Sequence, residues 1–182
     1  MAIPLNQGSK KTITIRLRDE DTDDPINLAD PGFEYLTACM PKADGTELMK
    51  AYIPRTATLA IGSPDITVDT TDLFEGCPVS GTGIPANTKI LYTPESAAPN
   101  ATPAGTVKLT NNATITGSSA LVFGDITIMS PAQWGKFQFD IKKDESPLLP
   151  EGPVGITVKV VISGDPLLKN FDNALDVKTV IC

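Results

Sequence analysis

Apolar and polar residues alternate along several short runs near both ends of the chain. Along Gly155–Ser163 every second residue from Ile156 to Ile162 is Ile or Val, and Thr12–Arg18 has the same period of two. Successive side chains of a strand point to opposite sides, so each run predicts a half-buried strand. The 16 Pro and 14 Gly are spread along the 182 residues, which disfavours long helices. The sequence therefore predicts an all-β protein.

The alternating runs fall into two groups, separated by a segment of different composition. Residues 59–124 are rich in Thr, Ser, Asn, Gly and Pro and hold two basic against five acidic residues. About seven strands flank this segment, a number typical of a two-layer β-sandwich. We expect an N-terminal arm over residues 1–11, a discontinuous sandwich over residues 12–58 plus 125–182, and an inserted small β-rich domain over residues 59–124.

The charge balance weighs against two classes of partner. Fifteen basic and 22 acidic residues give a net charge of −7, whereas binding to nucleic acid or to an anionic membrane surface depends on Lys and Arg. No apolar run approaches the about 20 residues of a membrane-spanning helix, and the N-terminus shows no secretory signal. We therefore expect no nucleic-acid or membrane partner and synthesis in a cytoplasm.

The sequence lacks histidine and the common catalytic and phosphate-binding motifs. The chain has no His, which removes Ser-His-Asp and Cys-His catalysis and His-based metal sites. No Gly-Lys-Ser/Thr phosphate loop occurs. We expect no enzyme activity, no catalytic residue, no cofactor and no bound metal.

Two acidic clusters remain as weaker candidates for chemistry. Asp19–Asp24 has carboxylates spaced as in a Ca²⁺ loop but lacks the Gly that such a loop needs, so a solvated turn is favoured. Asp140, with Asp144 and Glu145 nearby, resembles the paired carboxylates of a hydrolase. The place of Asp140 in an alternating strand favours an ordinary solvent-facing side chain.

The three cysteines, Cys39, Cys77 and Cys182, are far apart and form no CxxC motif. Reduced thiols, with Cys39 buried in a strand, are the favoured interpretation. The alternative is that Cys182, the last residue, forms a disulfide between subunits once a particle reaches an oxidising environment.

Three residues are candidates for a protein interface. Trp134, the only tryptophan, is either an interface anchor or a cap on the sandwich core. Arg16 and Arg18 share the polar face of one strand, where they either pair with acidic groups of a neighbouring protein or face solvent.

Five short segments of the outer regions occur in an order that resembles the N-terminal domain of the phage baseplate upper-protein family. The resemblance implies an immunoglobulin-like β-sandwich that anchors receptor-binding proteins to a tail. The inserted domain is a departure from that family. The segments are Ile13–Asp19, Pro25–Leu28, Leu36–Thr46, Gly135–Ile141 and Asn173–Lys178.

The middle region resembles small β-modules that recur in phage tail and fibre proteins. The resemblance lies in a Val-Ser-Gly-x-Gly-Ile-Pro turn, a following Thr-x-Ile and a later Leu-Thr-x-x-Ala-Thr. The segments are Gly76–Ile90, Thr106–Gly117 and Leu121–Gly124.

Together these resemblances imply a structural subunit of a tailed-bacteriophage particle, made in the host cytoplasm and located in the virion. The first expectation is a tail or baseplate adaptor that docks to other phage structural proteins, in multiple copies within a symmetric assembly. The alternatives are a head-decoration or neck/collar protein, and a module that binds a host receptor or glycan through residues 59–124.

Overall fold

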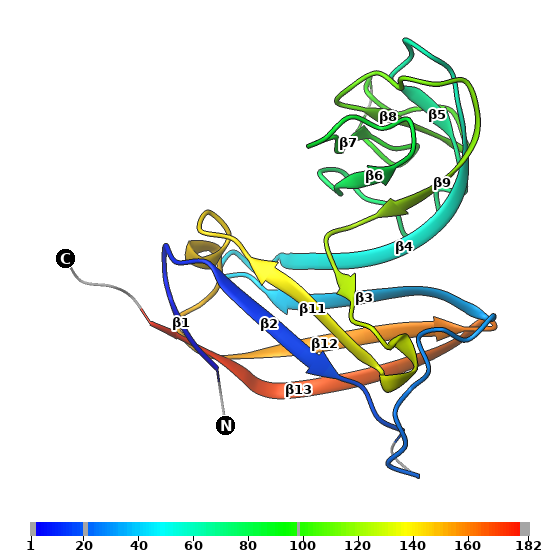
Figure 1. The fold of residues 1–182 in the computed structure, drawn as a ribbon. Coiled ribbons are helices and arrows are strands. Elements are labelled where there is room, and N and C mark those ends of the chain that lie inside the picture. Colours follow the sequence, from blue (N-terminus) through cyan, green and yellow to red (C-terminus); the bar gives the residue numbers. More distant parts are fainter. Residues whose placement is uncertain (1–2, 20–21, 98, 179–182) are drawn as a thin grey trace. The chain divides into compact units, whose positions relative to one another are not determined.

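The computed structural model describes residues 3–19, 22–97 and 99–178, and it divides the chain into two compact units (Figure 1). Unit 1 takes its residues from Met1–Tyr52 and Ile126–Cys182, and unit 2 from Ile53–Asp125. The expected inserted domain began at residue 59. The difference arises because β4 (Glu47–Leu59) is one unbroken strand that pairs with β3 in unit 1 and with β9 in unit 2.

The larger sheet of unit 1 has the strand order β1-β13-β12-β3-β4. Adjacent strands in this sheet run antiparallel, except that β1 runs parallel to β13. Its other strands are β1 (Ile3–Asn6), β3 (Phe33–Pro41), β12 (Gly152–Ile162) and β13 (Asp165–Lys178).

The smaller sheet of unit 1 is antiparallel, with the order β10-β11-β2. Its strands are β2 (Lys11–Arg16), β10 (Thr127–Ile128) and β11 (Lys136–Ile141). Two short 3₁₀ helices, η1 (Ala132–Trp134) and η2 (Ser146–Leu148), precede and follow β11. Strand β2 from the N-terminal segment thus pairs with β11 from the C-terminal segment.

The two sheets of unit 1 enclose one hydrophobic core. Inward side chains of the smaller sheet, such as Ile13 and Phe139, pack in one cluster with those of the larger sheet, such as Leu36 and Val158. All four are no more than 2% exposed. Burial of such side chains is worth about 1.5–3 kcal/mol each, so it sets which face of each strand turns inward. The all-β sandwich expected from the sequence is confirmed.

One expected feature of unit 1 is corrected. Residues 3–6, assigned to an extended arm over residues 1–11, instead form β1, whose register places Leu5 opposite Val177 of β13. The Leu5 side chain is 1% exposed and belongs to the core cluster. A single buried leucine between Pro4 and Asn6 is too weak a periodic signal to be read as a strand.

Unit 2 is a ring of short antiparallel strands in the order β6-β9-β4-β5-β8-β7. A bridge between Pro78 and Lys89 links β6 to β7, with hydrogen bonds from Val79 N to Thr88 O and from Ile90 N to Cys77 O, both 2.9 Å. Unit 2 is therefore a small closed barrel, and closure removes exposed strand edges. Its other strands are β5 (Asp65–Thr67), β6 (Val79–Gly81), β7 (Ile90–Tyr92), β8 (Thr106–Leu109) and β9 (Gly117–Phe123).

Candidate interaction surface

The outer face of the β2–β11 pair is polar and carries a group of cations at one end. Antiparallel register places Arg16 opposite Lys136, and Thr12 opposite Asp140. The alternate residues Ile13, Ile15, Phe137 and Phe139 turn into the core, so the four residues of these two pairs project to the opposite, outer face. The sandwich thereby brings together Arg16 from the N-terminal segment and Lys136 from the C-terminal segment.

Trp134 lies beside Lys136 and does not cap the core. Its side chain is 49% exposed, and Lys136 Nζ lies 5.7 Å from the ring centroid, within the range of a cation–π contact. The position of η1 is held by main-chain hydrogen bonds, with Leu17 N donating to Gly135 O at 2.9 Å and Leu28 N donating to Ala132 O at 3.2 Å. The aromatic ring is therefore presented on an anchored turn.

Arg16 and Arg18, grouped together by sequence, have different surroundings. Arg18 Nη1 donates to the carboxylate and the carbonyl of Asp23, at 2.7 and 2.8 Å, so this arginine stabilises the turn that follows β2. Arg16 is exposed, and no carboxylate of the described residues forms an ion pair with it or with Lys136. Like charges directly across a strand pair are mildly destabilising.

We call Trp134, Lys136 and Arg16 the Trp134 surface. It joins an exposed aromatic ring to two neighbouring cations, on a chain whose net charge is −7. The cations of such a surface can attract an acidic group, and the ring can pack against apolar atoms of the same partner. Lys136 was not a candidate from sequence, because only the register of β2 on β11 places it beside Arg16.

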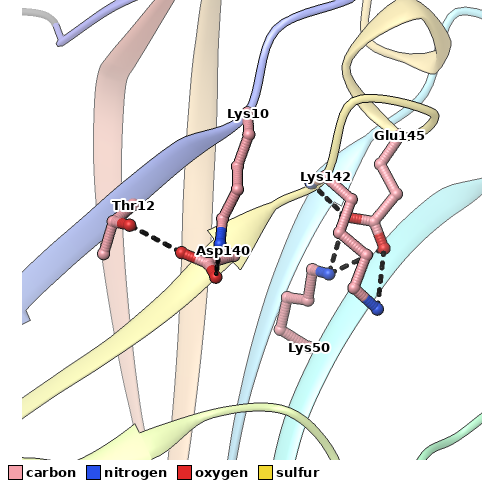
Figure 2. A network of polar contacts seen from close by, with 6 residues as sticks. All are labelled: Lys10, Thr12, Lys50, Asp140, Lys142 and Glu145. Atoms are coloured by element: carbon pink, nitrogen blue, oxygen red, sulfur yellow. Dashed lines mark hydrogen bonds and ion pairs between the residues drawn. The ribbon is translucent and has the colours of Figure 1, made fainter. Parts of the chain in front are cut away.

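A second polar group lies at the other end of the β2–β11 pair (Figure 2). Asp140 accepts a hydrogen bond from Thr12 Oγ1 at 2.6 Å and lies 2.7 Å from Lys10 Nζ. The hydrogen bonds from Lys10 and then from Thr12 hold the pKa of Asp140 below its ordinary value. This carboxyl is therefore ionised at neutral pH, which does not suit the general acid of a hydrolase.

The Asp140 carboxylate should make the free energy of unfolding depend on pH in the acidic range. A carboxyl whose pKa is lowered by folding stabilises the fold above its unfolded pKa, here 3.8, and loses that contribution as the pH falls through the folded value. We expect Asp140→Asn to lower the free energy of unfolding at pH 7. Below about pH 4 the free energies of unfolding of the variant and the wild type should become more similar. Urea titrations between pH 3 and 7 measure this difference. Asp144→Asn, the same substitution at an exposed position, is the matched control. An Asp140→Asn difference that stays constant with pH would contradict the assignment.

A buried ion pair lies within unit 1, close to this group (Figure 2). Lys50 is opposite Ala38 of the core in the β3–β4 register, and its side chain is 1% exposed. Lys50 Nζ donates to both carboxylate oxygens of Glu145, at 2.8 and 2.7 Å. Glu145 also accepts the backbone N–H of Lys142 at 2.8 Å. This pair joins β4 to the loop after β11, and no sequence signal distinguishes Lys50 from an exposed lysine.

The acidic turn after β2 is held by its own side chains. The Asp19 carboxylate accepts the backbone N–H of Thr22 at 3.0 Å, and Arg18 binds Asp23. Among residues 3–19, 22–97 and 99–178, no cluster of three or more Cys, Asp or Glu is arranged to hold a metal ion. The same residues contain no helix long and apolar enough to cross a membrane.

The two described cysteines are thiols with raised pKa values. Burial is the main cause for both, raising the pKa of Cys39 to about 11 and that of Cys77 to about 12. Both are protonated and weakly nucleophilic at neutral pH. Cys182, the candidate for a disulfide between subunits, lies outside the described residues.

Comparison of the chain with protein families, with curated proteins and with solved structures gives no match.

Proposed function

We propose that this protein is a non-enzymatic assembly subunit that docks to neighbouring proteins through the Trp134 surface. The observation that carries the proposal is a half-exposed Trp134 beside Lys136, which lies opposite Arg16. Neither cation has an ion-pair partner among the described residues. Exposed Trp and Arg side chains are enriched at the energetic centres of protein interfaces. A cationic surface on an acidic protein also favours contact through this face, because the remaining surface repels acidic partners.

The assembly that fits best is the particle of a tailed bacteriophage, as a tail or baseplate adaptor. Support comes from the ordered segments that resemble the baseplate upper-protein family, and from the combination of a β-sandwich with an inserted small β-barrel. Both units rest on main-chain pairing and on apolar cores. The alternative positions are head decoration and the neck or collar. The proposed partners are other structural proteins of the particle, and this chain is proposed to be present in multiple copies within a symmetric assembly.

Receptor or glycan binding through unit 2 has less support. Sugar rings stack on exposed aromatic side chains, and the inserted domain offers Phe74, Tyr92 and Phe123. Phe123 is fully buried, and the other two are only partly exposed. No group of exposed aromatic rings on the described part of unit 2 therefore favours this function.

Incorporation into particles tests the proposed function. We expect mass spectrometry of purified particles to find the wild-type chain in a fixed ratio to the other structural proteins. Trp134→Glu should be made and folded but incorporated at least about tenfold less, because a buried carboxylate is costly at an interface centre. Leu148→Glu is the matched control, because Leu148 is 45% exposed and lies outside the surface. Wild-type protein found only free in the lysate would contradict the proposal.

A further inference from the structure

Strand β2 forms one edge of the smaller sheet of unit 1. The order β10-β11-β2 places β11 on one side of it, and no other described strand pairs with it (Figure 1). An edge strand carries a row of N–H and C=O groups that no neighbouring strand uses, and a strand of another molecule can pair with them. The free edge of β2 is therefore a candidate site for strand addition.

The hydrogen-bond pattern shows which main-chain groups face this free edge. Leu17 N donates to Gly135 O at 2.9 Å, so these two residues form a hydrogen-bonded pair. Hydrogen-bonded and non-hydrogen-bonded pairs alternate along antiparallel strands, so Ile15 and Ile13 also bond to β11. The N–H and C=O groups of the alternate residues therefore point away from β11. These residues are Thr12, Thr14 and Arg16, and their side chains are exposed.

The edge of β2 lacks the features that usually prevent another strand from pairing with it. Such features are Pro, bulges, very short strands and charged side chains along the edge. Strand β2 has neither Pro nor Gly, and it pairs with β11 over all six residues without a shift in register. Its charged residues, Lys11 and Arg16, lie only at its two ends. By contrast, β1 at the edge of the larger sheet has four residues and includes Pro4.

The residue pattern of β2 is self-complementary about Thr14. When two copies of β2 run antiparallel with Thr14 opposite Thr14, each Thr12 lies opposite Arg16 and each Ile13 lies opposite Ile15. This register keeps the β-branched apolar residues together on the inner face, where such pairs are stabilising. It also separates the two Arg16 residues. Each Arg16 instead falls in the same row across the sheet as Asp140 of the other copy, so that a cation approaches a carboxylate.

We propose that two copies of this chain pair edge to edge through β2, about a two-fold axis at Thr14, and so join their smaller sheets into one continuous sheet. In this register the two Thr14 residues exchange both main-chain hydrogen bonds, and each Thr12 does the same with Arg16 of the other copy. A two-fold contact of this kind closes on itself, because each copy uses the same edge. The contact uses the main chain of β2, so it goes beyond the docking role of the Trp134 surface and does not depend on it.

Removal of one main-chain N–H tests the contact. Sedimentation velocity of the full chain is expected to show a reversible dimer. Thr14→Pro should lower the association constant at least about tenfold, because both hydrogen bonds at the two-fold axis lose their donors. This N–H does not bond to β11, so the variant should still fold, which circular dichroism verifies. Thr14→Val keeps the N–H and the β-branched shape, and as the matched control it should change association by less than about twofold.

Cysteine substitution tests the register without altering the main chain. Thr14→Cys should form a disulfide between copies under mild oxidation, because the Cα atoms of directly opposed residues lie about 5.5 Å apart, within the range of disulfides. Thr12→Cys should not, because the two copies of residue 12 are four residues apart along the strands, about 13 Å. Trypsin cleaves after Lys11 and Arg16. Mass spectrometry of the linked peptide, residues 12–16, therefore separates this disulfide from any that involves a native cysteine.

Three results would overturn the proposal. They are a full chain that is monomeric up to about 1 mM, a folded Thr14→Pro variant that dimerises like the wild type, and a Thr12→Cys variant that cross-links as readily as Thr14→Cys. Incorporation into particles is measured separately. A monomeric wild-type protein that still needs Trp134 for incorporation would reject the β2 contact and keep the docking role. A β2 dimer that is absent from particles would do the reverse.

Discussion

Replacing Glu145 with Gln is expected to lower the free energy of unfolding of unit 1 by about 3–5 kcal/mol. The substitution keeps the shape and the hydrogen-bond acceptor but removes the carboxylate charge that the ammonium of Lys50, 1% exposed, binds through two hydrogen bonds. Removing one partner of a buried pair is costly because the remaining charge has already lost its hydration. Trp134 is the only tryptophan and lies in unit 1, so its fluorescence in a urea titration reports this unit.

The double variant Lys50→Met/Glu145→Gln should recover most of the loss. Met fills the volume of the lysine stem without a charge, and such replacements are often neutral or stabilising. Lys142→Met is the matched control, because its ammonium lies 3.9 Å from the same carboxylate while its side chain is 43% exposed. Its cost should stay within about 1 kcal/mol. Equal losses for Glu145→Gln and Lys142→Met would show that burial does not govern this pair.

Gly135→Ala is expected to destabilise unit 1 by about 3 kcal/mol, from the backbone and from packing. The residue has a φ of 63°, a left-handed conformation that costs an L-residue about 1–2 kcal/mol. An added Cβ would lie 2.6 Å from Leu17 O and 2.9 Å from Ile26 O, which are main-chain atoms and do not move aside easily. Overpacking of this kind costs about 1–3 kcal/mol.

Gly45→Ala separates the two causes. Gly45 is also in unit 1 and has a φ of 82°, but nothing lies within 4 Å of an added Cβ. It should lose only the conformational part, about 1–2 kcal/mol. Urea titrations of both variants measure the difference. If the two substitutions cost the same, the close approach of Gly135 to the end of β2 does not stabilise the fold.

The parts of the fold that follow from local pattern could be predicted. Alternation in Thr12–Arg18 and Gly155–Ser163 identifies β2 and β12 and their buried faces, because the strand period of two is local. Barrel closure in unit 2 depends instead on Thr88 and Ile90 meeting Cys77 and Val79, where both segments are short and carry no periodic signal. Such pairing between distant segments is decided by the packing of unit 2 as a whole.

The candidate surface was only partly predictable for a similar reason. Trp134 and Arg16 can be selected by residue type, but Lys136 becomes a candidate only because the register places it opposite Arg16. Arg18 looked equivalent to Arg16 in the sequence. The pattern does not reveal that the turn after β2 brings Asp23 into hydrogen-bonding distance of Arg18. Lys50 was missed because a lysine in a strand is normally exposed, and its partner Glu145 lies 95 residues away.

The central claim is that the face carrying Trp134 becomes covered when the protein assembles. Hydroxyl-radical footprinting read by mass spectrometry tests it, by comparing oxidation of Trp134 in the isolated chain and in purified particles. Leu148 is the internal reference, because its exposure in the isolated chain, 45%, is close to the 49% of Trp134. We predict that oxidation of Trp134 falls at least about fivefold on assembly relative to Leu148, as expected for a residue at the centre of an interface. Equal oxidation of Trp134 in the free and assembled states would contradict the account.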